Sequence, residues 1–170
     1  MANEVYTRTN QTLFFARKAA AAWRDASTSG ALDAITQARY HREHVLFHLY
    51  RTVLAVVHEV AERYRWPLLD VRSVEQALDG SVTARFPGPE LAELTELASA
   101  GDSWLAGVLS AWHQLQAPPR PVESKPLEDD LIIASSAVMP EPEWSLDDAD
   151  AAIQALAERI ACYREGMVEW

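Results

Sequence analysis

One uninterrupted stretch, residues 31–65, constrains the fold more than any other feature of the chain. It reads ALDAITQARYHREHVLFHLYRTVLAVVHEVAERYR and contains neither Pro nor Gly. Its apolar residues recur at three- and four-residue steps, which is the period of an α-helix. At about 1.5 Å per residue such a helix is roughly 50 Å long, so several other segments must pack along it. The residues assigned to its buried side are Ile35, Ala38, Val45, Leu46, Leu49, Val53, Val56, Val57, Val60 and Tyr64.

The composition is that of a soluble globular protein with a strong negative charge. The 170 residues are 49% hydrophobic and carry a net charge of -10. A chain of this length can bury a sizeable core. Its acidic field repels phosphate backbones and acidic membranes, and only two Lys are present. We therefore expect neither a nucleic acid nor a membrane as partner.

The single cysteine and the N-terminal residues bear on the compartment. Cys162 stands alone, which excludes an intrachain disulfide and is typical of a reducing compartment. Residues 1–19 lack the long apolar core of a signal peptide. No segment approaches the ~20 apolar residues of a membrane span. These features predict a cytoplasmic protein.

Turn residues divide the rest of the chain into further helices. A break at residues 27–30, with Gly30 available for a left-handed cap, separates a first helix from the long one. So short a connection makes the two helices antiparallel neighbours. Ser145 is placed to cap the last helix, with Asp147 and Asp148 in its first turn. The predicted helices besides the long one are 3–27, 73–78 (capped by Ser73 and stopped at 79–80), 90–99, 103–116 and one from Ser145 onward.

Residues 117–143 differ in kind, because six of the nine Pro lie there. Pro at this density excludes a helix and favours extended chain. The apolar residues 131–134 would be out of place in a free linker, so we expect a long loop packed across the bundle. A short strand within 127–139 is left open. The sequence thus predicts a single all-α domain over residues 1–170, an antiparallel helical bundle of about four main helices plus short helices and this Pro-rich loop.

Three histidines, His41, His44 and His48, align along one stripe of the long helix, since residues three and four apart are neighbours. A pair four residues apart can share one zinc ion. His41 and His48 lie ~10 Å apart along the axis, too far for one ion. At about 100° per residue, the stripe falls nearly opposite the apolar face. Metal sites in bundles are built inward, so we expect a polar, solvent-exposed stripe with no bound metal or other cofactor.

Two families of helical-bundle enzymes nonetheless resemble this pattern. DinB-type proteins bind a metal with three His, and here His44, His48 and His113 match that set, in reversed order along the chain. The spacing of Arg39 and His44 is similar to the Arg and His of HEPN-type ribonucleases, with Tyr40 where a polar residue usually follows the Arg. A metal-binding or HEPN-like enzyme that uses the His41/His44/His48 stripe is therefore the alternative function.

The other reactive residues form no catalytic motif. His58, Glu59 and Glu62 lack the second His of a zincin motif, so we expect them on a solvated helix face. Cys162 has no base that the sequence identifies. The sequence favours a role that is not enzymatic.

The polar side of the long helix is the predicted interaction surface. Tyr40 and Phe47 border its histidines and Arg51, which makes it a basic patch flanked by aromatic rings on an acidic protein. Such a patch fits an acidic partner protein or a second copy of the chain, and its charge would rise as the imidazoles gain protons together below their ordinary pKa. We therefore predict a non-catalytic protein–protein interaction module. The predicted surface consists of Tyr40, His41, His44, Phe47, His48 and Arg51.

Nearly the whole chain resembles a small family of uncharacterised pseudomonad-type bacterial proteins. The likeness is carried by NEVYTRTNQTLFFARKA near the N-terminus, by HREHVLFHLYRTVLAVVHE in the long helix and by the Pro-rich loop. This resemblance implies a bacterial cytoplasmic protein. It implies no activity and no catalytic residue.

Overall fold

A computed structural model describes residues 2–118 and 143–168. The described residues form helices and no strand, which confirms the all-α class. The strand left open within 127–139 and most of the predicted loop lie outside the described residues, so one domain over 1–170 stays a prediction. The helices are α1 (Ala2–Ser27), α2 (Ala34–Tyr64), α3 (Val74–Ala77), α4 (Gly80–Arg85), α5 (Pro89–Ser99), α6 (Trp104–Gln116) and α7 (Leu146–Val168).

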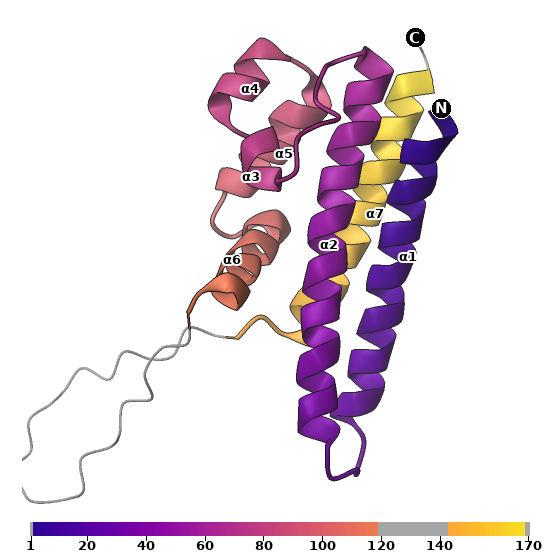
Figure 1. Cartoon of the computed structure of the whole chain (residues 1–170), viewed down its shortest axis with the longest axis vertical. Coiled ribbons are helices and arrows are strands. Elements are labelled where there is room, and N and C mark those ends of the chain that lie inside the picture. Colours follow the sequence, from indigo (N-terminus) through magenta and orange to yellow (C-terminus); the bar gives the residue numbers. More distant parts are fainter. Residues whose placement is uncertain (1, 119–142, 169–170) are drawn as a thin grey trace, which may run out of the picture.

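The three longest helices, α1, α2 and α7, lie side by side (Figure 1). Helices α3 and α6 pack against another side of α2, α4 contacts α3, and α5 contacts α6. Arg24 near the end of α1 pairs with Asp150 near the start of α7. Arg63 at the end of α2 donates a hydrogen bond to the carbonyl of Met167 near the end of α7. Hence α1 runs antiparallel to both α2 and α7, and these two run in the same direction. The chain is a helical bundle organised around α2, as its length predicts.

The apolar side of α2 forms the centre of the core. Leu49, Val53 and Val57 are fully buried there. Close approach of α1 is possible because small residues, Ala16 and Ala20 among them, fill its buried side. Ile35, predicted to be buried, is 87% exposed because the first turns of α2 extend beyond α7 next to the α1–α2 connection (Figure 1).

Side-chain caps begin the helices where the sequence places them. The hydroxyl of Ser73 accepts a hydrogen bond from the backbone N–H of Gln76 at 3.1 Å, at the start of α3. Ser145 Oγ accepts from the N–H of Asp148 at 3.2 Å, while the Asp148 carboxylate accepts from the N–H of Ser145 at 2.8 Å. This reciprocal pair satisfies two backbone donors that a helix start would otherwise leave unpaired. The predicted caps at Ser73 and Ser145 are confirmed.

The short helix predicted to stop at residues 79–80 does end there, with Leu78 as its C-cap. The same two residues also begin α4, which was not predicted, because Asp79 accepts a hydrogen bond from the N–H of Ser81 at 2.9 Å and caps the new helix. One cap prediction is wrong. Gly30 does not take the left-handed conformation. Among the described residues only Arg65 does, with φ of 57°, where it closes the C-terminus of α2 just before Trp66.

Candidate interaction surface

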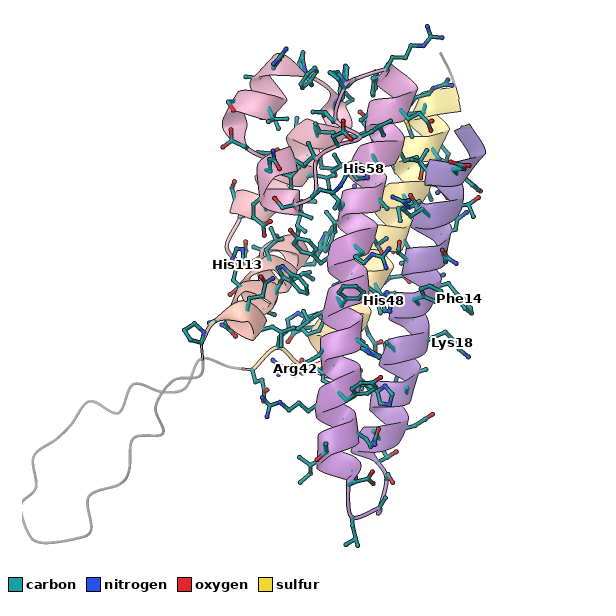
Figure 2. All side chains as sticks on the ribbon, viewed as in Figure 1. Phe14, Lys18, Arg42, His48, His58 and His113 are labelled. Atoms are coloured by element: carbon teal, nitrogen blue, oxygen red, sulfur yellow. The ribbon has the colours of Figure 1, made fainter. Side chains whose placement is uncertain are left out.

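The histidine stripe lies along the seam between α2 and α1. His41, His44 and His48 are all half-buried, and the His48 ring packs against Phe15 of α1 with centroids 5.3 Å apart. Figure 2 shows His48 on α2 and Phe14 on the neighbouring α1. The expectation of a fully exposed stripe is wrong, because the small alanines of α1 bring that helix close enough to cover one edge of the stripe.

Aromatic rings form a continuous band across three helices. Successive centroids along the band are 6.1, 5.3, 5.2 and 6.4 Å apart. Three of its side chains remain open to solvent, with exposed fractions of 54%, 38% and 41% for Phe14, Phe15 and Phe47. Contiguous exposed rings of this kind are typical of interaction sites. In order, the band consists of Phe14 and Phe15 of α1, His48 and Phe47 of α2, and Trp112 of α6.

A second line of rings leaves this band and follows α2 toward its N-terminus. His44 lies 6.2 Å from His48 and 4.2 Å from Tyr40, measured between ring centroids. Tyr40 is 52% exposed. The line forms because residues three and four apart share one side of a helix. We call the band, this line and Arg51 the aromatic face, which consists of Phe14, Phe15, Tyr40, His41, His44, Phe47, His48, Arg51 and Trp112.

Arg51 supplies positive charge to the aromatic face. Its guanidinium carbon lies 5.4 Å from the centroid of the Phe47 ring, in cation–π contact, and the residue is exposed. Burial, and then the nearby charges of His44 and Arg51, hold the pKa of His48 below its ordinary value. His48 is therefore neutral at pH 7 and gains its proton at lower pH than an exposed histidine does.

Two residues of the alternative enzyme sites, His113 and Arg39, have other polar partners in the structure. His113 lies on α6, where its Nε2 is 2.9 Å from Oε1 of Glu75, and α6 lies on another side of α2 from α1 (Figures 1 and 2). Arg39 forms an ion pair with Glu43 at 3.6 Å. Within residues 2–118 and 143–168, no three His, Cys, Asp or Glu side chains come together in a way that could hold a metal ion.

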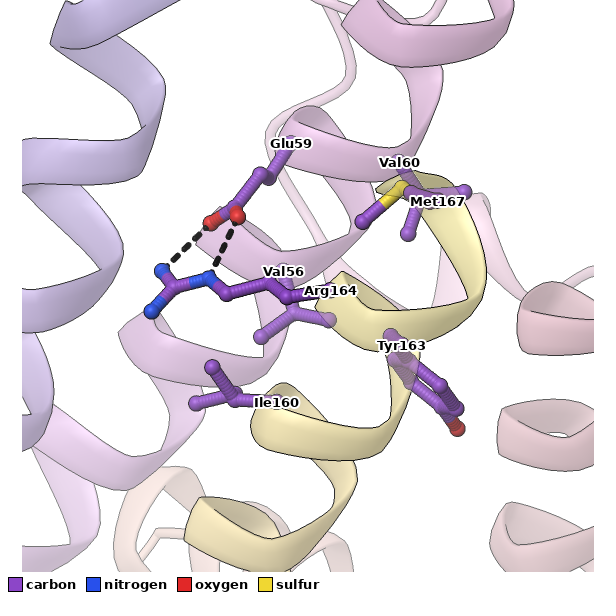
Figure 3. A pocket seen from close by; sticks show the side chains of 7 residues that line it. All are labelled: Val56, Glu59, Val60, Ile160, Tyr163, Arg164 and Met167. Carbon is purple, nitrogen blue, oxygen red and sulfur yellow. Dashed lines mark hydrogen bonds and ion pairs between the residues drawn. The ribbon is translucent and has the colours of Figure 1, made fainter. Parts of the chain in front are cut away.

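His58 and Glu59 are not on a solvated helix face, so that prediction is wrong. His58 is 5% exposed, and its Nε2 donates to the carbonyl of Val71 at 2.9 Å. Glu59 accepts two hydrogen bonds from Arg164 of α7, at 2.7 and 3.0 Å. The connection after α2 and helix α7 cover this part of α2. Figure 3 shows the Glu59–Arg164 pair at a narrow gap between α2 and α7, which is otherwise lined by Val56, Val60, Ile160, Tyr163 and Met167.

Sequence reasoning missed the contribution of α1 to the aromatic face. The predicted surface contains only residues of the long helix, so Phe14 and Phe15 lie outside it. Adjacent residues on a helix point about 100° apart, so two neighbouring Phe cannot both face the same core. That spacing was the one local indication that an aromatic ring is exposed on α1.

Fold and surface together define an all-α helical-bundle protein with a partly exposed aromatic face. The chain belongs to DUF6586, a family of unknown function, whose model matches residues 1–170. The predicted membership of an uncharacterised family is thereby confirmed. Comparison with curated proteins and with solved structures gives no match. Among the described helices, none combines the length and the apolar character that crossing a bilayer requires.

Proposed function

We propose that the protein is a non-catalytic protein–protein interaction module whose aromatic face binds an acidic protein surface that also carries apolar side chains. The observation that supports this is the exposure of linked rings: Phe14, Phe47 and Tyr40 are 54%, 41% and 52% exposed. Each ring that a partner covers contributes apolar burial of about 25 cal/mol per Å². Binding would therefore stabilise an arrangement that is unfavourable in water.

Charge favours an acidic partner over a second copy of the chain. Arg51 stands over Phe47 within the aromatic face and is exposed. A carboxylate opposite it would form a charge-assisted contact next to the rings. A two-fold dimer through the same surface would instead bring this patch against itself, because symmetric interfaces are self-complementary.

A pair of synthetic helical peptides tests the proposal. Both carry the same Leu and Phe positions, and one has Glu where the other has Lys. Fluorescence anisotropy should show the Glu peptide binding at least about tenfold more tightly, and Phe47→Ala should weaken it by about tenfold, as for a hot-spot ring. Arg51→Glu should remove the preference for the Glu peptide.

The matched control is Leu69→Ser, which removes a leucine that is 45% exposed but lies in the connection after α2, outside the aromatic face. This variant should bind the Glu peptide as the wild type does. Circular dichroism confirms that each variant is folded. Equal affinity for the two peptides would overturn the proposal. So would a wild-type dimer in sedimentation that Phe47→Ala dissociates, since the face would then belong to a second copy.

A further inference from the structure

A hydrogen-bonded chain of three ionisable side chains joins α2, α3 and α6, and none of them belongs to the aromatic face. The Tyr50 hydroxyl donates to Oε2 of Glu75 at 2.6 Å, and Nε2 of His113 lies 2.9 Å from Oε1 of the same carboxylate. The ring of Trp112 stacks on Tyr50 with centroids 4.6 Å apart. Tyr50 and His113 lie 25 and 38 positions from Glu75 in sequence, and only the fold brings the three together.

Tyr50 determines which atom donates in each hydrogen bond among Tyr50, Glu75 and His113. The backbone N–H of Val74 can only donate, and it lies 2.9 Å from the Tyr50 oxygen. Tyr50 therefore directs its own proton to Glu75, and burial followed by the Glu75 hydrogen bond raises the pKa of Tyr50 to about 12. The ionised carboxylate only accepts, so neutral His113 carries its proton on Nε2. Its Nδ1 is left as a hydrogen-bond acceptor.

The histidine end of the chain lies at a hollow between α3, α5 and α6. Glu75 and His113 are among its lining residues, together with the apolar Leu78, Ala98 and Leu109. In the described part of the protein, neither a lysine nor an arginine lines it. An apolar concavity with a few convergent polar groups, one of them tied to a perturbed ionisable partner, has the make-up of a small-molecule site.

We propose that this hollow binds a small organic cation, with an ammonium group on an apolar body. The ammonium N–H would donate to Nδ1 of His113, beside the negative charge of Glu75, and the apolar body would cover Leu78 and Leu109. An anion would meet an acceptor and a carboxylate, which disfavours it on both counts. The net charge of -10 acts in the same direction.

Three probes with the same six-carbon body test the charge requirement. These are hexylammonium, hexanol and hexanoate, each titrated into the full chain at pH 7.5 and followed by NMR. Hexylammonium should bind saturably and at least about tenfold more tightly than hexanol, the effect expected of a charged hydrogen bond at a partly open site. Hexanoate should show no saturable binding.

Glu75→Gln tests whether hexylammonium binding depends on the His113 proton being on Nε2. The amide oxygen can still accept from Tyr50, but the amide nitrogen then donates toward Nε2 of His113. The imidazole proton must move to Nδ1, so the acceptor for the ammonium is lost. Nitrogen-15 NMR of the histidine rings should report protonated Nε2 in the wild type and protonated Nδ1 in the variant. Hexylammonium affinity should fall at least about tenfold with that change.

Two further variants keep the test decisive. His113→Ala removes a side chain that is 61% exposed, so folding is retained, and it should also lower hexylammonium affinity. His41→Gln alters a half-buried histidine of α2, outside the hollow, and should leave the affinity unchanged. Equal binding of hexylammonium and hexanol overturns the proposal. A changed His113 tautomer with unchanged hexylammonium affinity also overturns it, because the hydrogen bonds among Tyr50, Glu75 and His113 would then serve only to join three helices.

Discussion

Arg164 ties α7 to both α1 and α2, and replacing it measures how much this contributes to stability. Its Nε and Nη2 donate to the two carboxylate oxygens of Glu59, at 2.7 and 3.0 Å. Its Nη1 donates to Oδ1 of Asn10 at 2.9 Å, and the guanidinium carbon lies 4.0 Å from the centroid of the Tyr6 ring. One side chain therefore holds three helices at one level of the bundle.

The burial of the Arg164–Glu59 pair determines how much free energy of unfolding we expect Arg164→Met to lose. The side chains of Arg164 and Glu59 are 23% and 13% exposed. Exposed ion pairs contribute about 0–1 kcal/mol, whereas removal of one partner of a fully buried pair costs about 3–5 kcal/mol. This pair lies between these limits, so we expect a loss of about 2–3 kcal/mol in the free energy of unfolding. Most of that loss arises because the Glu59 carboxylate remains, poorly solvated and without its cation.

Urea denaturation in a double-mutant cycle separates the Arg164–Glu59 interaction energy from the other effects of each substitution. The four proteins are the wild type, Arg164→Met, Glu59→Gln and the double variant. Because Gln leaves no stranded charge, the double variant should be about 1–2 kcal/mol more stable than the sum of the single losses predicts. Arg39→Met is the control, since Arg39 is 79% exposed in its pair with Glu43, and it should cost under about 0.5 kcal/mol. A loss below about 1 kcal/mol for Arg164→Met, or simple additivity, would refute this reasoning.

Two further predictions concern the residues around the end of α2. Burial holds the pKa of His58 below its ordinary value of 6.5, so the unfolded chain binds this proton more readily. The free energy of unfolding should therefore fall as the pH drops through about 6.5, and urea titrations at pH 7.5 and 5.5 should show a smaller fall for His58→Gln. A Cβ added at Gly88 would lie 2.6 Å from Cη2 of Trp66, whose ring is held by Tyr64 at 4.5 Å between centroids. Gly88→Ala should thus cost about 1–3 kcal/mol by thermal denaturation, whereas Gly101→Ala, with no atom within 4 Å, should have little effect.

Much of the helical framework could be predicted because its determinants are local. The three-four apolar pattern identifies α2, and Ser145 with Asp148 marks the start of α7 through side chains three residues apart. The wheel of α2 also identifies Leu49 and Val53 as core residues, and both are fully buried. Periodicity suffices here because each of these helices buries one broad apolar side.

The surroundings of the polar residues of α2 could not be predicted in this way. A helical wheel gives the direction of His58 and Glu59 but not which segment covers them. The hydrogen bond from His58 to Val71 depends on the path of the connection after α2, and the bond to Glu59 comes from Arg164, 105 residues away. Likewise, the three members of the Tyr50 chain come from separate helices. Residues so far apart in sequence carry no spacing that indicates their contact.

The exposed rings of the aromatic face are notable because other helices cover most of α2. Helices α1, α3, α6 and α7 all contact α2, so most of its circumference is covered within the described part of the protein. One strip remains open, where Tyr40 is 52% and Phe47 is 41% exposed. In a helix that serves only to stabilise a bundle, the side exposed to solvent is expected to be polar. On α2 the polar residues His58 and Glu59 are covered by other segments, whereas the open strip carries the rings of Tyr40 and Phe47 beside the exposed Arg51. The stability of the free chain does not require exposed rings at these positions, whereas the proposed partner would need them, because it would bury Tyr40 and Phe47.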